Sequence, residues 1–335
     1  GGMGRCHFNC YKNVANAELV AVCDVRTERA REIAGPDMPI YESLDEMLEK
    51  EQFDMLDICT PSYLHREMSI KALEYGLHVL CEKPMSLNST DAAAIKAAAE
   101  RSGKLFMTAH VVRFMAPYAY LKTVVDAGAH GRLLRLDMRR ISSVPLWSWN
   151  NWMLDLEKSG GTPIDLSIHD LDFIQYMLGQ PDSVRGVYRK LKDNCDSITS
   201  ELFYGDTLVT AEGAWYSYKL PFTCTYSAVF ENGTLEYHGG KVYENGEEVE
   251  LDAGKVIGRL MKLLSVFHIH RVHDEVIVKM LLVAVGGNND LIAGKVSGKA
   301  QTDFVRGRGG QLVIGAERLD NVVILPAVDL AEFVF

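Results

Sequence analysis

Two polar residues have the types and spacing needed for acid–base chemistry on an alcohol. Asp165 and His169 are four residues apart in a stretch with helical character, so their side chains share one helix face and can touch. A carboxylate beside an imidazole fixes its tautomer and raises its basicity, which suits a general base that takes a hydroxyl proton. Taken alone, an Asp and a His at this spacing are more often a solvated pair.

A third residue, Lys83, follows a short apolar run at Leu77–Cys81 that is typical of a buried strand. Open parallel sheets bind ligands at the carboxyl ends of their strands, so Lys83 is expected at a ligand-binding edge. Its ammonium group there can hydrogen-bond a reacting oxygen and stabilise a developing alkoxide. A lysine at a strand end is usually a surface charge, so the hypothesis depends on the three residues occurring together.

The first hundred or so residues alternate apolar runs with helical stretches, which predicts right-handed crossovers and a parallel sheet. An N-cap is expected at Ser89 or Thr90, which precede an alanine-rich helix. The expected strands are Leu19–Cys23, Met55–Cys59, Leu77–Cys81 and Leu105–Ala109. The expected helices are Arg5–Asn13, Thr27–Ala34, Leu64–Tyr75 and Asp91–Arg101.

The sequence opens on Gly1-Gly2-Met3-Gly4, before a helix-compatible stretch. Glycines at a strand-to-helix turn let a pyrophosphate approach the backbone, and Asp24 follows about twenty residues later, where a carboxylate meets ribose hydroxyls. In a full pattern Gly1 is the second glycine, so we expect an N-terminal truncation that removes the first glycine and its strand. Asp24 favours NAD over NADP; Arg26 weakens that preference, although a solvated surface arginine is the simpler interpretation.

From about Gly131 the pattern changes to long β runs, which predicts an α+β domain with a mostly antiparallel sheet. A single strong helix, Asp165–Leu178, interrupts these runs and ends at Gly179. Asn232-Gly233 and Asn245-Gly246 are typical of hairpin turns. The β runs are Leu133–Val144, Val184–Leu191, Ile198–Phe203, Thr207–Tyr218 and Thr223–Phe230.

Separated motifs follow one another in a specific order. They are Gly4-Arg5-Cys6-His7, Thr60-Pro61 with His65, Glu82-Lys83-Pro84, Gly160-Gly161-Thr162-Pro163-Ile164-Asp165, and His169-Asp170. Over about residues 1–250 this arrangement resembles the glucose–fructose oxidoreductase / inositol dehydrogenase family (Gfo/Idh/MocA). The resemblance implies a Rossmann domain followed by a domain with a large open sheet, and dimers or tetramers that associate through that sheet.

The resemblance also implies roles for residues. The catalytic set is Lys83, Asp165 and His169, and the Lys83-Pro84 bond is expected to be cis. The cofactor-binding set is Gly1, Gly2, Met3, Gly4, Asp24, Arg26, Thr60, Pro61, His65, Glu82 and Lys83. The substrate-binding set is Lys83, Arg113, Trp152, Asp165 and His169. For His65 and His7 a packing role is equally plausible; Arg113 can be structural, and Trp152, with Trp147 and Trp149, can simply be buried.

The predicted domains are residues 1–113 (NAD-binding, first strand missing), 114–253 (substrate and oligomerisation) and 254–335 (a divergent tail). After Gly254 the family pattern is lost. The tail carries His268, His270 and His273, but no carboxylate or cysteine framework supports a metal, so we expect none. Codons for 261–264 read in another frame can encode Glu-Ile-Ala, so a frameshift in the gene or its sequencing is one explanation of the tail.

Composition narrows the partners. The 335 residues are enough for two domains, and the formal charge of −10 argues against nucleic acid or an anionic membrane as the main partner. The longest apolar candidate, Val276–Val285, is too short to span a bilayer and contains Lys279. No secretory signal opens the sequence, and seven cysteines without paired spacing suggest reduced, buried thiols, so we expect a cytoplasmic protein.

These observations predict an NAD-dependent dehydrogenase that moves a hydride between nicotinamide and a secondary carbinol of a sugar or cyclitol, with NADP as the alternative cofactor. One rival is a sugar-ketone reductase with a tightly bound cofactor. Another is a non-catalytic nucleotide-binding or sensing protein, against which the joint presence of Lys83, Asp165 and His169 counts. Neither the substrate nor the physiological direction follows from the sequence.

Overall fold

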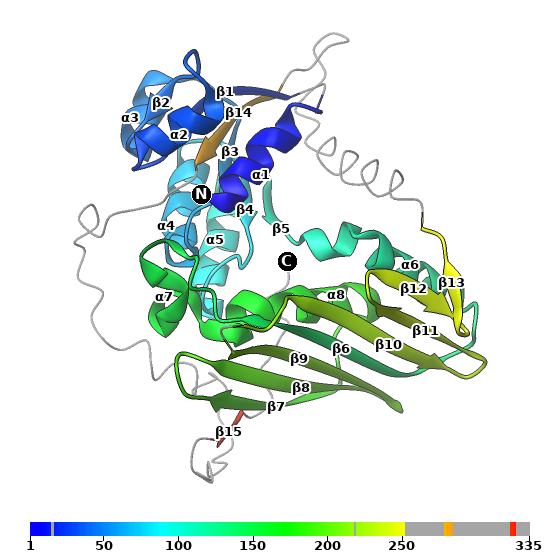
Figure 1. Ribbon diagram of the computed structural model, residues 1–335. Coiled ribbons are helices and arrows are strands. Elements are labelled where there is room, and N and C mark those ends of the chain that lie inside the picture. The colour runs from blue at the N-terminus through cyan, green and yellow to red at the C-terminus, as the bar shows by residue number, and fades with distance from the viewer. Residues whose placement is uncertain (15–16, 218, 252–277, 284–321, 326–335) are drawn as a thin grey trace. The chain divides into compact units, whose positions relative to one another are not determined.

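The computed structural model describes residues 1–14, 17–217, 219–251, 278–283 and 322–325. These residues form two compact units (Figure 1). The first holds Gly1–Ala109 with the strand at 278–283, and the second begins at His110 and includes the strand at 322–325. The division therefore falls four residues before the predicted boundary at 113. The three tail histidines and the stretch 261–264 lie outside the described residues.

A six-stranded parallel sheet is the centre of the first unit, as predicted. Its strands run in the order β2-β1-β14-β3-β4-β5. The place between β1 and β3 is filled by β14, which pairs with both in parallel. The strands are β1 (Ala17–Cys23), β2 (Ile40–Tyr41), β3 (Met55–Ile58), β4 (His78–Glu82), β5 (Phe106–Ala109) and β14 (Val278–Val283).

Helices connect the strands and pack on the sheet (Figure 1). Leu56, Ile58 and Val79 are fully buried in the main core of this unit, so the strands are apolar without alternation, as in sheets covered on both faces. The helices are α1 (Gly2–Tyr11), α2 (Thr27–Ala34), α3 (Leu44–Lys50), the short η1 (Ser62–Leu64), α4 (His65–Glu74) and α5 (Ser89–Ser102).

Two helix starts differ from the prediction. The first helix begins at Gly2 rather than Arg5, so Gly2, Met3 and Gly4 form its first turn instead of a loop before it. The N-cap of α5 is Asn88, not Ser89 or Thr90: its extended backbone and its side chain, which accepts the N–H of Asp91 at 2.8 Å, satisfy an otherwise unpaired donor.

The second unit is built on a nine-stranded sheet in the order β13-β12-β11-β10-β6-β9-β8-β7-β15. The sheet is antiparallel apart from the central β6–β9 pair, which is parallel. The mostly antiparallel sheet is therefore confirmed. The strands are β6 (Leu133–Ser143), β7 (Ser183–Lys190), β8 (Asp196–Tyr204), β9 (Thr207–Ser217), β10 (Thr223–Phe230), β11 (Gly233–His238), β12 (Lys241–Glu244), β13 (Glu247–Val249) and β15 (Val322–Leu325).

One of the two predicted hairpin turns holds as stated. Asn245 and Gly246 both have positive φ and connect β12 to β13, as a two-residue turn of mirror-image type requires. The other prediction is one residue late: the turn residues are Glu231 and Asn232, and Gly233 already pairs with Phe230. Only glycine fits at this strand position, because a Cβ on residue 233 would lie 2.8 Å from Asn245 Oδ1.

Helices lie along one face of the large sheet (Figure 1). Tyr118, Leu121, Phe173 and Ile174 are buried against strand residues such as Leu136. The helical segments of this unit are η2 (Val111–Phe114), α6 (Ala116–Ala127), η3 (Trp149–Leu154), α7 (Leu156–Ser159), η4 (Thr162–Leu166) and α8 (Ile168–Leu178).

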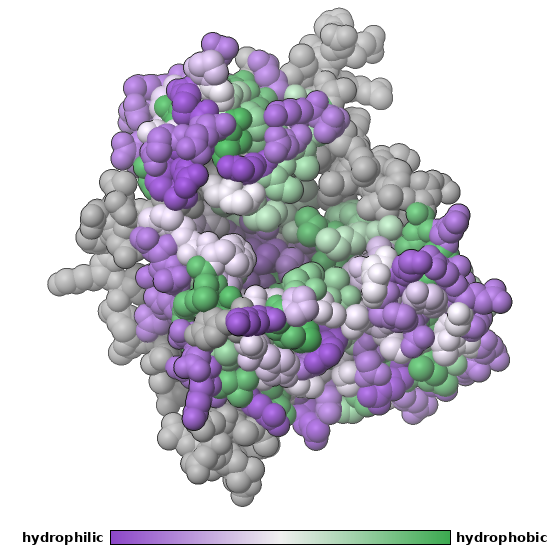
Figure 2. Space-filling model, viewed as in Figure 1, coloured by the Kyte–Doolittle hydropathy of each residue, from purple (hydrophilic) through white to green (hydrophobic). Residues whose placement is uncertain are grey.

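The face of the large sheet that points away from the helices carries charged residues on β6 and β9. Arg139 Nε lies 2.7 Å from Glu212 on β9, and Arg135 Nε lies 2.6 Å from Asp137 on the same strand. Side chains alternate between the faces of a strand, so these pairs face away from the residues that pack against the helices. Figure 2 shows hydrophilic residues over most of the visible surface, with hydrophobic residues in small separate groups.

Among the described residues, no helix combines the length and apolar character needed to cross a lipid bilayer. The cysteines are free thiols, but two of them contradict the expectation that all are buried: Cys6 and Cys10 are exposed on α1. They occupy the face of that helix opposite Phe8 and Tyr11, which pack inward.

Candidate active site

Predicted cofactor residues lie at the carboxyl edge of the parallel sheet. Asp24 directly follows β1, Thr60 follows β3, and Glu82 is the last residue of β4. Because these strands belong to one parallel sheet, their ends share an edge. It is the edge at which open α/β sheets bind ligands.

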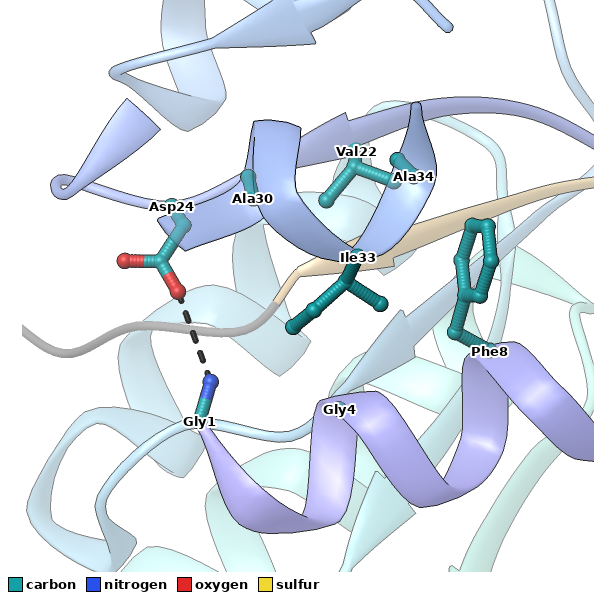
Figure 3. Close-up of a pocket in the computed structure, with 8 residues that line it drawn as sticks. All are labelled: Gly1, Gly4, Phe8, Val22, Asp24, Ala30, Ile33 and Ala34. Atoms are coloured by element: carbon teal, nitrogen blue, oxygen red, sulfur yellow. Dashed lines mark hydrogen bonds and ion pairs between the residues drawn. The ribbon is translucent and has the colours of Figure 1, made fainter. Parts of the chain in front are cut away.

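A pocket at this edge lies between β1 and the helices α1 and α2 (Figure 3). Asp24 is only 2% exposed; its Oδ1 accepts the backbone N–H of Arg26 at 3.0 Å, and its Oδ2 lies 3.4 Å from the Gly1 nitrogen. A helix N-terminus beside a buried carboxylate fits the phosphate and ribose of a dinucleotide. The lining residues are Gly1, Gly4, Phe8, Val22, Asp24, Ala30, Ile33 and Ala34.

The remaining residues of the glycine-rich start divide between the pocket and solvent. Gly4 is buried in the pocket wall, whereas Gly2 and Met3 are exposed, Met3 to 45%. Arg26 is half-buried directly before α2. Contact of Gly2, Met3 and Arg26 with a cofactor therefore stays a prediction.

The Glu82-Lys83-Pro84 motif forms the turn after β4. The Lys83–Pro84 peptide bond is cis, as expected. Glu82 is buried, and its Oε2 accepts the backbone N–H of Lys83 at 3.1 Å, while the Lys83 side chain is half-buried. The carboxylate of Glu82 therefore fixes the backbone of Lys83, the residue predicted to hydrogen-bond the reacting oxygen.

His65 connects two of the sequence motifs. It is 1% exposed; Nδ1 lies 2.6 Å from the carbonyl oxygen of Pro84 and Nε2 lies 3.0 Å from that of Thr60. Burial lowers the pKa of His65, so the ring is neutral and donates a single hydrogen bond, best to the nearer carbonyl of Pro84. Through this bond His65 holds the turn after β4, while its other ring nitrogen lies against the turn after β3.

His7 is the centre of a buried cluster of acids below these turns. Its Nδ1 lies 2.8 Å from Asp57 Oδ2 and its Nε2 lies 3.0 Å from Glu82 Oε1, while the Tyr11 hydroxyl donates to Asp57 at 2.6 Å. Burial disfavours charge on His7, but Asp57 and Glu82 outweigh it and raise the pKa of His7 far above 6.5. His7 is therefore an imidazolium that donates to two carboxylates and joins α1 to β3 and β4.

A metal is the other occupant to consider for this cluster. Ligand atoms of His7, Asp57 and Cys59 lie within 4.8 Å of one another, and Cys59 is buried. Both ring nitrogens of His7 and Oδ2 of Asp57 are already engaged in the hydrogen bonds above, and burial, with the charge of Asp57, raises the pKa of Cys59. The hydrogen bonds of His7 to Asp57 and Glu82 account for the arrangement of the cluster in this structure.

Asp165 and His169 lie in consecutive segments of the second unit. Asp165 is in η4, a single π-helical turn closed by the bond from Ser167 N–H to the Thr162 carbonyl at 2.8 Å, whereas His169 is in the first turn of α8. The prediction of one regular helix is wrong here. Asp165 is 5% exposed and His169 is half-buried. A π-turn at a functional site is common, because it re-aims one side chain within a helix.

Two further acids of α8 are bound by arginines. Arg140 Nη2 lies 2.7 Å from Asp170 in a fully buried pair. Arg113 makes two hydrogen bonds to Asp172, and His110 Nε2 lies 3.5 Å from the same carboxylate. The guanidinium of Arg113 is thus committed to Asp172, and its contact with substrate stays a prediction.

The predicted tryptophans differ in exposure. Trp152 is half-buried and packs against a cluster that includes Leu166 and Trp215, whereas Trp147 is 79% exposed. Trp149 is half-buried. Trp152 therefore packs against Leu166 of the turn that carries Asp165, and a substrate contact for it remains a prediction.

Sequence reasoning missed three buried acids that hold these segments: Asp57, Asp172 and Asp196. A signal existed for Asp57, since a carboxylate inside the apolar strand Met55–Ile58 needs a partner. Asp172 lies among apolar residues on α8 in the same way. Asp196 begins a strand after polar residues, and nothing in the local sequence marks it as buried.

The extent of each unit agrees with family comparisons. Residues 1–110 match the domain model of the oxidoreductase family with the NAD-binding Rossmann fold, and residues 118–236 match the Gfo/Idh/MocA C-terminal domain. This chain belongs to the Gfo/Idh/MocA family. The predicted resemblance is thereby confirmed, and the first unit is an NAD-binding Rossmann domain.

Individual relatives match over part of their length. The 2,7-anhydro-N-acetylneuraminate hydratase of Mediterraneibacter gnavus is 33% identical over 175 residues, which is 52% of this chain and 46% of the relative. The myo-inositol 2-dehydrogenase of Thermotoga maritima is 30% identical over 185 residues, 54% of this chain and 53% of the relative. The chain thus spans about half the length of these curated relatives.

A solved structure of levoglucosan dehydrogenase in complex with NADH and levoglucosan has a TM-score of 0.64 to this chain. It is 20% identical and covers 75% of this chain and 77% of its own. At this identity the likeness shows the fold: a Rossmann-type parallel sheet followed by a large, mostly antiparallel sheet.

Proposed function

We propose that this Gfo/Idh/MocA protein is an NAD-dependent oxidoreductase that transfers a hydride between nicotinamide and a secondary carbinol of a sugar or cyclitol. The observation that carries the proposal is the turn after β4, where Glu82 and His65 hold Lys83 at the same sheet edge as the pocket of Asp24. A cationic side chain at a cofactor-binding edge is suited to an alcohol oxygen that becomes negative during reaction.

The residues divide the reaction as follows. Lys83 donates a hydrogen bond to the carbinol oxygen, and His169 takes the proton of the hydroxyl group as the general base. Asp165 orients His169 and stabilises the imidazolium that forms. A nicotinamide held by the residues of the first unit would supply the acceptor for the hydride of the carbinol carbon, so that one proton and one hydride would be removed from the alcohol. The reverse sequence reduces the ketone.

The cofactor preference rests on Asp24. Its buried carboxylate accepts hydrogen bonds from a ribose diol and repels a 2′-phosphate, which favours NAD over NADP. The first unit provides a helix N-terminus for the pyrophosphate at Gly1–Gly4. NADP is the alternative to be measured against NAD.

Names of relatives support a sugar or cyclitol as the substrate. The Thermotoga relative is named a myo-inositol dehydrogenase, and the levoglucosan dehydrogenase was solved with NADH and an anhydro-sugar. The hydratase relative supports a second candidate, a conversion of an anhydro-sugar acid without net redox change. We further propose a homodimer or homotetramer and a cytoplasmic location, which the large open sheet and the free cysteines respectively motivate.

A substrate screen tests the proposal. NAD and NADP reduction is followed by absorbance against inositols, hexoses, amino sugars and sugar acids, and NADH oxidation against the corresponding ketones. Reduction of NAD by at least one polyol, with a lower rate for NADP, is the expected result. A parallel arm incubates 2,7-anhydro-N-acetylneuraminate with catalytic NAD and detects product by mass spectrometry. Product there without net NADH favours the hydratase-like alternative, and tight NADH binding without any turnover contradicts the enzyme proposal.

A further inference from the structure

Asp196, the first residue of β8, is a buried acid that touches the turn ahead of Asp165. It is 4% exposed, and its Oδ2 accepts the backbone N–H of Thr162 at 3.0 Å and the hydroxyl of Tyr188 at 3.3 Å. The Thr162 N–H is one of the first donors of a helical segment and has no partner within it. Asp196, on β8, therefore caps the N-terminus of η4.

The backbone beside Thr162 is shaped to accept this carboxylate. Gly161 has φ +63° and ψ −160°, a conformation open to glycine and costly for other residues. A Cβ at Gly161 would lie 2.5 Å from Asp196 Oδ2 and 2.8 Å from Leu156 Cδ2. Gly161 thus lets the chain pass within hydrogen-bond distance of the acid.

The Gly161–Thr162 peptide leads directly to Asp165, the residue proposed to orient His169. The Thr162 carbonyl accepts the Ser167 N–H at 2.8 Å, and this bond closes the π-turn that contains Asp165. At the far end of the turn, Ser167 is pressed against β9, where a Cβ on Gly213 would overlap Ser167 Oγ. With Ser167 fixed by the sheet, the position of Thr162 determines the shape of the turn.

The pKa of Asp196 reflects the groups around it. Burial raises the pKa of Asp196, the hydrogen bonds from Thr162 and Tyr188 oppose the rise, and the negative charge of Asp165 adds to it. A hydrogen bond to a peptide N–H is available to the neutral acid as well as to the carboxylate, so the cap persists in both forms.

We propose that Asp196 is a positioning residue for the proposed reaction: it fixes the Gly161–Thr162 peptide and thereby sets how the π-turn presents Asp165 to His169. The inference rests on the proposed function of Asp165 and His169, but the contact of Asp196 with the turn does not. A misplacement of about 1 Å at a reacting group costs up to about a hundredfold in rate. The effect is expected in turnover rather than in cofactor binding, because Asp196 and the pocket of Asp24 belong to different units.

Three variants separate this role from general stability. Asp196→Ala removes the acceptor, Asp196→Asn keeps an oxygen for the Thr162 N–H, and Asp182→Ala is the matched control. Asp182 also accepts a backbone N–H, that of Gly205 at 2.6 Å, but it is exposed and caps a turn between strands. Each variant is measured for kcat, KM, NADH affinity and amide hydrogen exchange of the peptide that contains Gly161–Ser167.

Asp196→Ala is expected to lower kcat by roughly tenfold to a hundredfold, with KM and NADH affinity within about twofold of the parent. Its Thr162 amide should exchange at least about tenfold faster, while exchange in the sheet core is unchanged. Asp196→Asn should restore kcat to within about threefold and restore amide protection, and Asp182→Ala should match the parent.

Parental kcat in Asp196→Ala with an opened turn overturns the inference, and so does parental exchange at Thr162. Equal losses in Asp196→Asn and Asp196→Ala also overturn it, since the acceptor oxygen is then irrelevant. A parent that binds NADH but converts no polyol refutes the proposed function instead; the exchange measurement then decides whether Asp196 holds the turn.

Discussion

Buried carboxylates occur in both units, but their counter-charges differ. In the NAD-binding unit His7 stands between Asp57 and Glu82, and its charge depends on a proton. In the second unit Asp170 is paired with Arg140, whose guanidinium is not deprotonated in proteins. The cation of the first arrangement can lose its proton as pH rises, whereas the cation of the second cannot.

The His7 cluster and the Arg140–Asp170 pair hold different elements. The His7 cluster joins α1, which begins at the pocket of Asp24, to β4, which ends directly before Lys83. Both elements are therefore held through one group whose charge depends on a proton. The Arg140 pair anchors α8, which carries His169, to β6. The charge of Arg140 persists as pH rises, so this contact to the helix of the proposed base is not lost on the alkaline side.

The largest expected effect concerns the arginine pair. Arg140→Leu leaves Asp170 buried and uncompensated, and removing one partner of a buried pair costs roughly 3–5 kcal/mol of unfolding free energy. The matched control is Arg139→Leu, the neighbouring residue on β6, whose pair with Glu212 is exposed and contributes at most about 1 kcal/mol. Denaturant unfolding measures both. Equal losses in the two variants would remove the distinction between the buried and exposed pairs.

His7→Gln is expected to cost less, roughly 1.5–3 kcal/mol, because a neutral amide replaces a charged donor between two carboxylates. The pH dependence distinguishes it. The pKa of His7 is raised in the folded state, so its contribution is complete below about pH 6.5 and falls as pH rises toward the folded pKa. From about pH 8 to about pH 9, His7 should make the unfolding free energy of the parent fall by up to about 1.4 kcal/mol more than that of His7→Gln.

That comparison is made by unfolding both proteins at the two pH values, with His65→Gln as the control. His65 is neutral because burial lowers its pKa, so its replacement should leave the slope between these pH values unchanged. Equal slopes in the parent and His7→Gln would show that His7 carries no proton there. The contrast between the two units would then be lost.

The sequence predicted the order of domains and most strands because apolar runs and turn residues are local signals. Helix Thr27–Ala34 and strand Thr223–Phe230 are found at the predicted residues. Helix α6 and the strands beyond Phe230 were not predicted, although the Asn245-Gly246 turn was. Register and sheet order, including the parallel β6–β9 pair, depend on contacts between distant residues that no local pattern encodes.

For the candidate site the limits were similar. Lys83, Asp165 and His169 could be selected because their motifs are specific and occur in order. The contacts that hold the Lys83 turn could not be predicted: His7 is bonded to Asp57 and Glu82, which lie 50 and 75 residues away along the chain. The π-turn at Asp165 also departs from regular helical spacing, because Gly161, Asp196 and Ser167 constrain it through tertiary contacts.

The most direct test of the account measures turnover and NAD affinity in Lys83→Ala and His169→Ala, with the exposed Lys96→Ala as the control. If Lys83 acts on the reacting oxygen, its loss should lower kcat by about a hundredfold to a thousandfold while NAD affinity stays nearly intact. His169→Ala should lower kcat by roughly a hundredfold to ten-thousandfold and flatten the alkaline rise of alcohol oxidation. Lys96→Ala should retain parental turnover. Folded Lys83→Ala and His169→Ala proteins with near-parental rates would contradict the assignment, and the chain would then be established only as an NAD-binding protein.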